Sequence, residues 1–294
     1  MTDYTDFWYT SHDGLRLYAR DYSAALYKNK QAKTILCMHG LTRNSADFED
    51  ICSKLAVDYR LIVVDQRGRG LSDYDPDYTN YNPLVYVQDM FLLLVELELS
   101  SVILLGTSMG GIMAMIMSAM KPEVVQAVIL NDVGPEIAKP GLDRLKKYVG
   151  KSQPVSNWEE AAKQTASINS IAFPEANDQF WLNFAKRIFN EDDKGCPVLA
   201  HDPNIAIPLM SSGEDDGETS AAPDLWPVYE QILELPIMLI RGELSDIIDA
   251  ECVQKMQQKK PDIDLLEISN VGHAPLLNEP DVESRIVKFL NSVS

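Results

Sequence analysis

The sequence reads Leu104-Leu105-Gly106-Thr107-Ser108-Met109-Gly110-Gly111, a Gly-x-Ser-x-Gly pattern. An apolar run before it is typical of a buried strand, and the Met-, Ala- and Ile-rich stretch 112–120 after it is typical of a buried helix. A serine on the sharp turn between them takes a strained backbone conformation that holds its hydroxyl outward. The residues on either side of the serine come close to one another at this turn, and glycine at both positions removes side chains that would collide. The same pattern also occurs in turns that only pack, so the rest of the chain must decide.

Further apolar runs along the chain alternate with amphipathic stretches. This alternation predicts a mostly parallel sheet with helices on both faces, an α/β fold. An antiparallel hairpin is expected over 8–20, where Asp13-Gly14 is a strong turn signal. Strands are predicted at 34–38, 61–64, 102–105, 127–130, 236–240 and 263–268, and the apolar runs at 34–38 and 102–105 are typical of buried strands.

The alternation stops between Pro135 and Pro227, where no buried strand is evident. Helical patterns occur there instead, at 141–149, 157–167 and 177–190. We therefore expect an inserted helical cap at 135–227. The core domain would then consist of two parts, 1–134 and 228–294.

Composition narrows the functional class. The 294 residues carry a formal net charge of −18, which argues against nucleic acid or an anionic membrane as a partner. No signal-peptide pattern and no membrane-length apolar run is present, and the four cysteines are scattered. We expect a cytoplasmic chain with free thiols, no metal site and a small-molecule substrate. The sequence leaves open whether the chain is a monomer or a homodimer.

Polar residues follow four of the predicted strands: His39, Ser108, Asp246 and His273. The carboxyl ends of parallel strands meet at one edge of the sheet, so these side chains should lie near one another. Serine needs a base to accept its proton, histidine can be that base, and a carboxylate can orient the imidazole. The chain order Ser, Asp, His accompanies this kind of serine turn.

With these motifs the chain resembles the α/β-hydrolase fold family, in the branch with a serine nucleophile and a helical cap. The matching stretches are 39–40, 65–70, 106–111, 242–246 and 272–275. By resemblance, the catalytic residues are Ser108 (nucleophile), His273 (general base) and Asp246 (orienting acid), and the backbone N–H groups of Leu41 and Met109 form the oxyanion hole.

The acid of this triad has competitors. Asp249 lies three residues beyond Asp246, and Asp132 follows the strand after the serine strand, where some relatives carry the acid. Arg67 is expected to tie loops together through its guanidinium group.

The motifs are most similar to those of carboxylesterases, 3-oxoadipate enol-lactonases and haloperoxidase-like esterases. This resemblance implies hydrolysis of a small carboxylic ester or lactone through an acyl-serine, with no cofactor. Acyl transfer or carbon–carbon bond hydrolysis would use the same triad, and a non-catalytic ligand receptor is a third possibility.

The substrate-binding candidates lie beside the oxyanion loop and in the cap. Arg43 either contacts a substrate carboxylate or is solvated. The aromatic side chains of the cap suggest a pocket for an apolar acyl or alcohol group; they include Phe173, and Trp226 at the exit of the cap. The residues among them that we take as substrate-binding candidates are Trp158, Phe180, Trp181 and Phe184.

Overall fold

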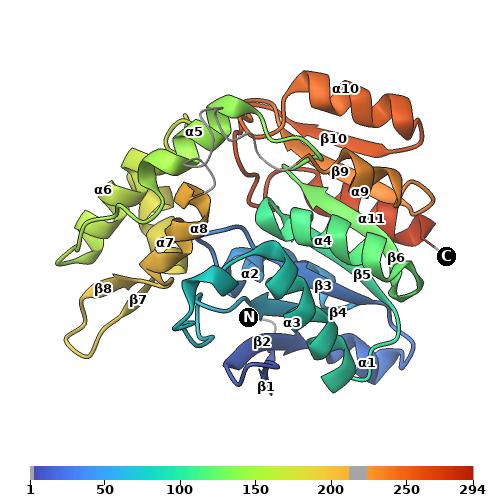
Figure 1. Cartoon of the computed structure of the whole chain (residues 1–294), viewed down its shortest axis with the longest axis horizontal. Coiled ribbons are helices and arrows are strands. Elements are labelled where there is room, and N and C mark those ends of the chain that lie inside the picture. The colour runs from blue at the N-terminus through green and yellow to red at the C-terminus, as the bar shows by residue number, and fades with distance from the viewer. Residues whose placement is uncertain (1–2, 212–223, 294) are drawn as a thin grey trace.

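The computed structural model describes residues 3–211 and 224–293 (Figure 1). Its centre is an eight-stranded sheet in the order β1-β2-β4-β3-β5-β6-β9-β10. The strands from β4 to β10 in that order are parallel, and β2 pairs antiparallel with both β1 and β4, so the predicted mostly parallel sheet is confirmed. The strands are β1 (Thr5–Thr10), β2 (Arg16–Tyr22), β3 (Thr34–Met38), β4 (Arg60–Asp65), β5 (Val102–Thr107), β6 (Val125–Asn131), β9 (Ile237–Gly242) and β10 (Asp264–Ile268).

The inner strands are buried on both faces, which explains their continuous apolar runs. In β3, Leu36 and Met38 pack into the hydrophobic core on one face, while Ile35 and Cys37 pack into the core on the other. Successive side chains of a strand point to opposite faces, so each apolar run supplies both cores at once.

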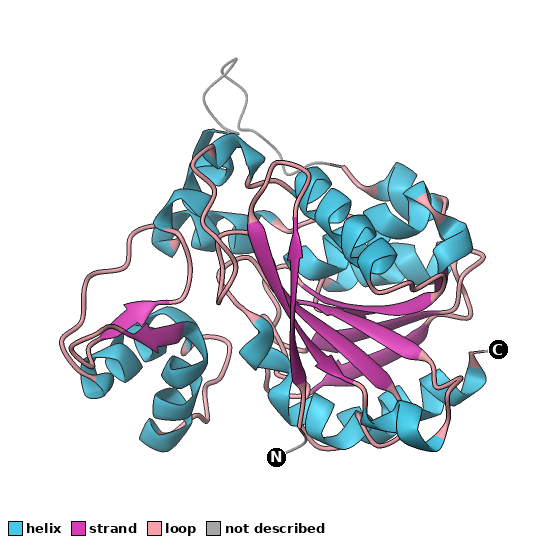
Figure 2. Cartoon of the chain, turned by 90° about the horizontal axis from the view of Figure 1, so that it is seen from below, coloured by secondary structure: helices cyan, strands magenta, loops and turns pink. Residues whose placement is uncertain are grey.

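Helices cover both faces of the sheet, as predicted (Figure 2). Helices α3, α4, α9 and α10 pack on one face, and α2 and α11 on the other. In the described part of the chain, no helix is both long enough and apolar enough to cross a bilayer. The bounds of the covering helices are α2 (Glu49–Leu55), α3 (Pro83–Glu96), α4 (Met109–Met120), α9 (Trp226–Glu230), α10 (Ala250–Lys259) and α11 (Val282–Ser292).

Between β6 and β9, the elements from α5 to α8 lie to one side of the sheet (Figures 1 and 2). The three predicted helices are present, but the antiparallel hairpin of β7 and β8 was not predicted, because each strand has only three residues. Helix α9 packs against the core helix α4. Part of the predicted cap lies outside the described residues, and its division from the core remains a prediction. The elements are α5 (Lys139–Tyr148), α6 (Trp158–Asn169), α7 (Asp178–Ile188), β7 (Phe189–Glu191), β8 (Pro197–Leu199) and α8 (Ala206–Ser211).

A short backbone pairing joins this segment to the loop after β4. The Gly70 N–H donates to the Ala200 carbonyl at 2.7 Å, and the Asp202 N–H donates to the Gly68 carbonyl at 2.8 Å. Backbone hydrogen bonds of this kind fix position independently of side-chain packing.

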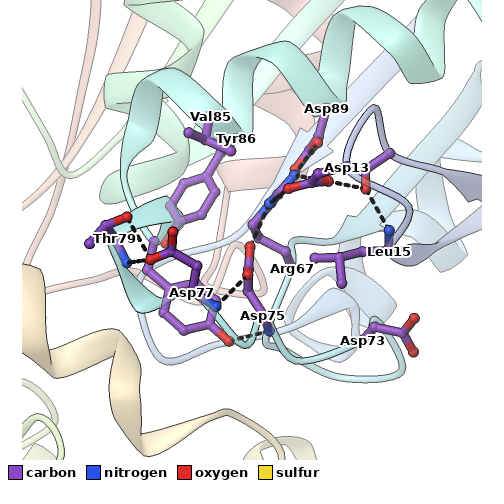
Figure 3. Close-up of polar contacts among 12 residues, drawn as sticks. Asp13, Leu15, Arg67, Asp73, Asp75, Asp77, Thr79, Val85, Tyr86 and Asp89 are labelled. Carbon is purple, nitrogen blue, oxygen red and sulfur yellow. Dashed lines mark hydrogen bonds and ion pairs between the residues drawn. The ribbon is translucent and has the colours of Figure 1, made fainter.

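Arg67, in the same loop after β4, is the buried centre of a polar cluster (Figure 3). Its guanidinium group donates to Asp13 in the β1–β2 turn, to Asp75 in a loop and to Asp89 on α3, at distances of 2.6 to 2.7 Å for the closest contact with each. Arg67 therefore ties three separate segments together, as the sequence predicts. Its hydrogen bond to Asp13 lowers the pKa of that carboxyl to about 2.

Replacing Arg67 with methionine will destabilise the fold by about 3–5 kcal/mol, because it leaves the buried carboxylates of Asp75 and Asp89 without their cation. Urea unfolding followed by circular dichroism measures this loss. The matched control is Asp13→Asn, which removes a partner whose side chain is 43% exposed and should cost about 1 kcal/mol or less. Equal losses for the two variants would contradict this assignment.

Candidate active site

Ser108 stands on the turn between β5 and α4, in a backbone conformation with φ 54° and ψ −117°. Its N–H donates to the Asn131 carbonyl at 2.9 Å, which ties the turn to β6. A Cβ atom on Gly106 would lie 2.2 Å from the Gly110 carbonyl oxygen, and one on Gly110 would lie 2.0 Å from the Met38 carbonyl oxygen. Glycine at both positions is what allows the turn to close.

The Ser108 hydroxyl is the first member of a hydrogen-bonded series. The distance from Ser108 Oγ to His273 Nε2 is 2.8 Å, and the distance from His273 Nδ1 to Asp132 Oδ2 is 2.7 Å. These three residues follow β5, β10 and β6, so the carboxyl ends of three strands bring them together. Such a series can pass a proton from the serine to the imidazole while the carboxylate orients the ring.

Asp132 is fully buried, and its surroundings suit a carboxylate. The Gly242 N–H donates to its Oδ1 at 2.8 Å, and the Ser245 hydroxyl donates to its Oδ2 at 2.7 Å. With the contact to His273, both carboxylate oxygens of Asp132 therefore have hydrogen-bond partners.

The prediction that Asp246 orients the histidine is wrong. Both carboxylate oxygens of Asp246 accept from Arg144 on α5, at 2.5 and 2.8 Å. Burial opposes the charge on Asp246, but the hydrogen bond and the charge of Arg144, together with smaller contributions, lower the pKa of Asp246 below its ordinary value. Asp249 is not the acid either, because its side chain caps α10 by accepting from the Cys252 N–H at 2.8 Å. The sequence signal for Asp132 was its place directly after β6.

The oxyanion loop that the sequence predicts follows β3. His39 is fully buried, and burial lowers its pKa to about 3, so the ring is neutral. The ring binds the Gly40 carbonyl through Nδ1 at 2.7 Å and accepts from the Gln66 N–H at Nε2. Arg69 is also buried and donates to the Leu41 carbonyl at 2.9 Å. These bonds hold the loop in place beside Ser108.

The two N–H groups predicted for an oxyanion hole belong to Leu41 and Met109. Within residues 3–211 and 224–293, neither N–H donates a hydrogen bond to a protein acceptor. Met109 is the first residue of α4, so its N–H is among those that a helix leaves without an internal partner. Both groups are therefore available to a ligand.

A cavity of about 70 Å³ opens over Ser108. Its floor is formed by the loops that carry Ser108, His273 and Leu41, and its roof by side chains of α5, α6 and α7. Part of the wall is apolar and part is polar. The lining residues are Gly40, Leu41, Arg43, Asp47, Phe48, Thr107, Ser108, Leu145, Tyr148, Asn169, Phe173, Phe184, His273, Ala274, Pro275, Leu276 and Leu277.

Two of the predicted substrate-binding residues line this cavity. They are Arg43 and Phe184. The Arg43 guanidinium group forms a bidentate ion pair with Asp47, with N–O distances of 2.6 and 2.5 Å. Its carbon lies 4.1 Å from the centre of the Phe184 ring. Arg43 is thus neither solvated nor a lone cation, and Asp47 compensates its charge.

The other three predicted residues do not line the cavity. Trp181 and Phe180 pack with Phe173 and Phe184 in an aromatic cluster inside the helical segment. Trp158 is further away, and its indole N–H donates to Glu191 of β7 at 2.8 Å. The prediction that these three residues line the pocket is therefore wrong. Their side chains contact other residues of the helical segment instead.

Sequence reasoning missed other lining residues. Leu145 and Tyr148 lie on one face of α5, and Asn169 ends α6. The sequence gives little indication that these residues line a cavity, because amphipathic helices carry similar side chains on any face that packs against a neighbour. In the described part of the chain, no three His, Cys, Asp or Glu side chains come together in a group that could hold a metal ion.

Comparison with known proteins identifies the family of the chain. The sequence pattern of the alpha/beta hydrolase fold family matches residues 33–280. The 3-hydroxybutyrate-oligomer hydrolase of Cupriavidus necator is 33% identical over 251 residues, which cover 84% of this chain and 85% of that protein. The 2-(acetamidomethylene)succinate hydrolase of Mesorhizobium japonicum is 28% identical over 259 residues, which cover 88% and 87%.

Solved structures agree as well. The crystal structure of an alpha/beta hydrolase from Novosphingobium aromaticivorans matches with a TM-score of 0.90 and 36% identity, over 99% of both chains. A putative hydrolase from Rickettsia typhi matches with a TM-score of 0.85 and 26% identity, over 99% of this chain and 100% of that one. The chain is a hydrolase and belongs to the α/β-hydrolase fold family.

Proposed function

We propose that the chain is a serine hydrolase that cleaves a small carboxylic ester or lactone through an acyl-serine intermediate. The observation that carries this proposal is the hydrogen-bonded series of Ser108, His273 and Asp132, with distances of 2.8 and 2.7 Å. A serine hydroxyl within hydrogen-bond distance of an oriented imidazole is the arrangement that activates a serine nucleophile.

The residues then have the following roles. His273 Nε2 accepts the proton of Ser108 while Oγ attacks the substrate carbonyl carbon. The N–H groups of Leu41 and Met109 receive the oxyanion that forms. When the intermediate collapses, His273 gives the proton to the departing alkoxide, and an alcohol leaves. A water molecule, deprotonated by His273, next attacks the acyl-serine. When this second intermediate collapses, His273 returns the proton to Ser108 Oγ and the carboxylic acid leaves.

The size of the cavity favours a small substrate. A cavity of about 70 Å³ holds few atoms beyond the reacting carbonyl group. The relative from Cupriavidus necator is named for hydrolysis of 3-hydroxybutyrate oligomers, whose units are joined by ester bonds. We therefore propose short acyl or hydroxyacyl esters as the first substrates to test.

The test combines turnover with labelling of the nucleophile. Purified protein is assayed with p-nitrophenyl acetate and p-nitrophenyl butyrate, and its intact mass is measured after treatment with a fluorophosphonate. We expect turnover and one label per chain, located on Ser108 by peptide mapping. Absence of both would contradict the proposal.

Labelling without ester turnover would also contradict hydrolysis of simple esters. It would favour the other reactions of the same triad, acyl transfer or carbon–carbon bond hydrolysis. Repeating the assay with an added alcohol separates hydrolysis from transfer, because transfer yields a new ester instead of a free acid.

A further inference from the structure

A second cavity lies beside the catalytic one. It has a volume of about 30 Å³ and contains no member of the Ser108 series. Since one water-sized probe needs roughly 10–15 Å³, this space admits a small group only. Its walls are mostly apolar, and the lining residues are Thr42, Tyr148, Val149, Gly150, Ser152, Gln164, Thr165, Ile168, Ile188, Phe189, Leu199 and His201.

Tyr148 lines both cavities. At the end of α6, two consecutive residues line different cavities. Asn169 lines the catalytic cavity, and Ile168 lines the second one. The two spaces are therefore adjacent, and the tyrosine forms part of the partition between them.

The helix that carries Tyr148 is held against the core. A Cβ atom on Gly141 would lie 2.3 Å from the Asp246 carbonyl oxygen, so α5 approaches that loop through its glycine. The Ala138 N–H donates to the Ile247 carbonyl at 2.9 Å. Arg144, one turn before the tyrosine, is bound by Asp246, and its guanidinium carbon lies 5.8 Å from the centre of the Tyr148 ring.

We propose that Tyr148 sets the length of acyl chain that the enzyme accepts. This inference rests on the proposed esterase function. The fixed ring ends the catalytic cavity, so acyl chains that extend past it collide with the ring. Removal of the ring joins the two cavities, and the apolar walls formed by Val149, Ile168, Ile188 and Leu199 then receive the end of a longer apolar chain.

The test measures kcat/KM for p-nitrophenyl acetate, butyrate, hexanoate and octanoate. Wild-type protein should prefer the short esters. Tyr148→Ala should move the preference to hexanoate or octanoate, with a gain of about fourfold for each additional methylene buried. Tyr148→Phe keeps the ring and should retain the wild-type profile.

A second substitution tests where the longer chain goes. Of the two cavities, Ile168 lines the second and not the catalytic one, so a bulkier side chain at this position narrows the second cavity. In the double variant Tyr148→Ala/Ile168→Trp the tryptophan fills the added space, and the preference should return to short esters. Tyr148→Leu serves as a less disruptive replacement if the alanine variant does not fold.

The outcomes separate the two proposals. A folded Tyr148→Ala or Tyr148→Leu protein with the wild-type chain-length profile overturns the role of Tyr148. A shifted profile that Ile168→Trp does not reverse overturns the second cavity as the place of the longer chain. If wild-type protein hydrolyses none of these esters, the esterase function itself has failed.

Discussion

Replacing Ser108 with alanine will lower kcat for p-nitrophenyl butyrate about 10⁵- to 10⁶-fold and abolish fluorophosphonate labelling, because the variant has no Oγ to form the acyl intermediate. Binding need not weaken, since the cavity walls and the oxyanion N–H groups remain. The measurement is the steady-state rate at saturating ester, together with the intact mass after labelling.

Ser284→Ala is the matched control for this experiment. Ser284 is an exposed serine on α11, where its hydroxyl donates only to the Asp281 carbonyl. That variant should retain wild-type turnover and labelling. Substantial ester hydrolysis or labelling by folded Ser108→Ala protein would show that another group is the nucleophile.

The second large effect distinguishes two acids. Asp132→Asn will lower kcat about 10⁴-fold, because an amide at this position favours the wrong tautomer of His273. Asp246→Asn should lower kcat less than about tenfold, since a partly exposed ion pair contributes little. Pre-steady-state kinetics with p-nitrophenyl butyrate gives the rate of acylation for each variant.

Both substitutions replace a carboxylate with an amide of the same shape, so each is a control for the other. Thermal unfolding of the two variants shows whether either loss of activity comes from loss of the fold. If Asp246→Asn had the larger effect on acylation, the series through Asp132 would not be the working one.

Much of the core was predictable because its signals are local. Gly106, Ser108 and Gly110 specify one turn, and steric contact at that turn explains why those residue types occur there. The inner strands, such as β3 and β5, are largely apolar because both of their faces are buried. His273 was identified because it is one of only four histidines and follows the last strand.

The acid could not be chosen in this way. Asp132, Asp246 and Asp249 all follow strands at the same edge of the sheet, and sequence spacing does not reveal which carboxylate faces the imidazole. The choice depends on Arg144, which lies more than 100 positions before Asp246 and takes both of its oxygens. Long-range pairing of this kind leaves no local pattern.

The cavity lining was hard to predict for a related reason. Aromatic side chains on an isolated helical segment can pack with one another or point at a substrate, and hydrophobicity is the same in both cases. Phe184 does both, whereas Trp181 only packs. The composition of the segment therefore predicted that helices cover the cavity, but it did not predict which side chains face Ser108.

The position of the acid after β6 has a consequence for how this enzyme can diversify. The loop after β9 contributes Ser245, which donates a hydrogen bond to Asp132, and its next residue, Asp246, forms an ion pair with Arg144 on α5. Substitutions at Asp246 or Arg144 can therefore alter the roof over the substrate while the reacting groups stay in place. In evolutionary terms, substrate range and chemical competence can vary separately.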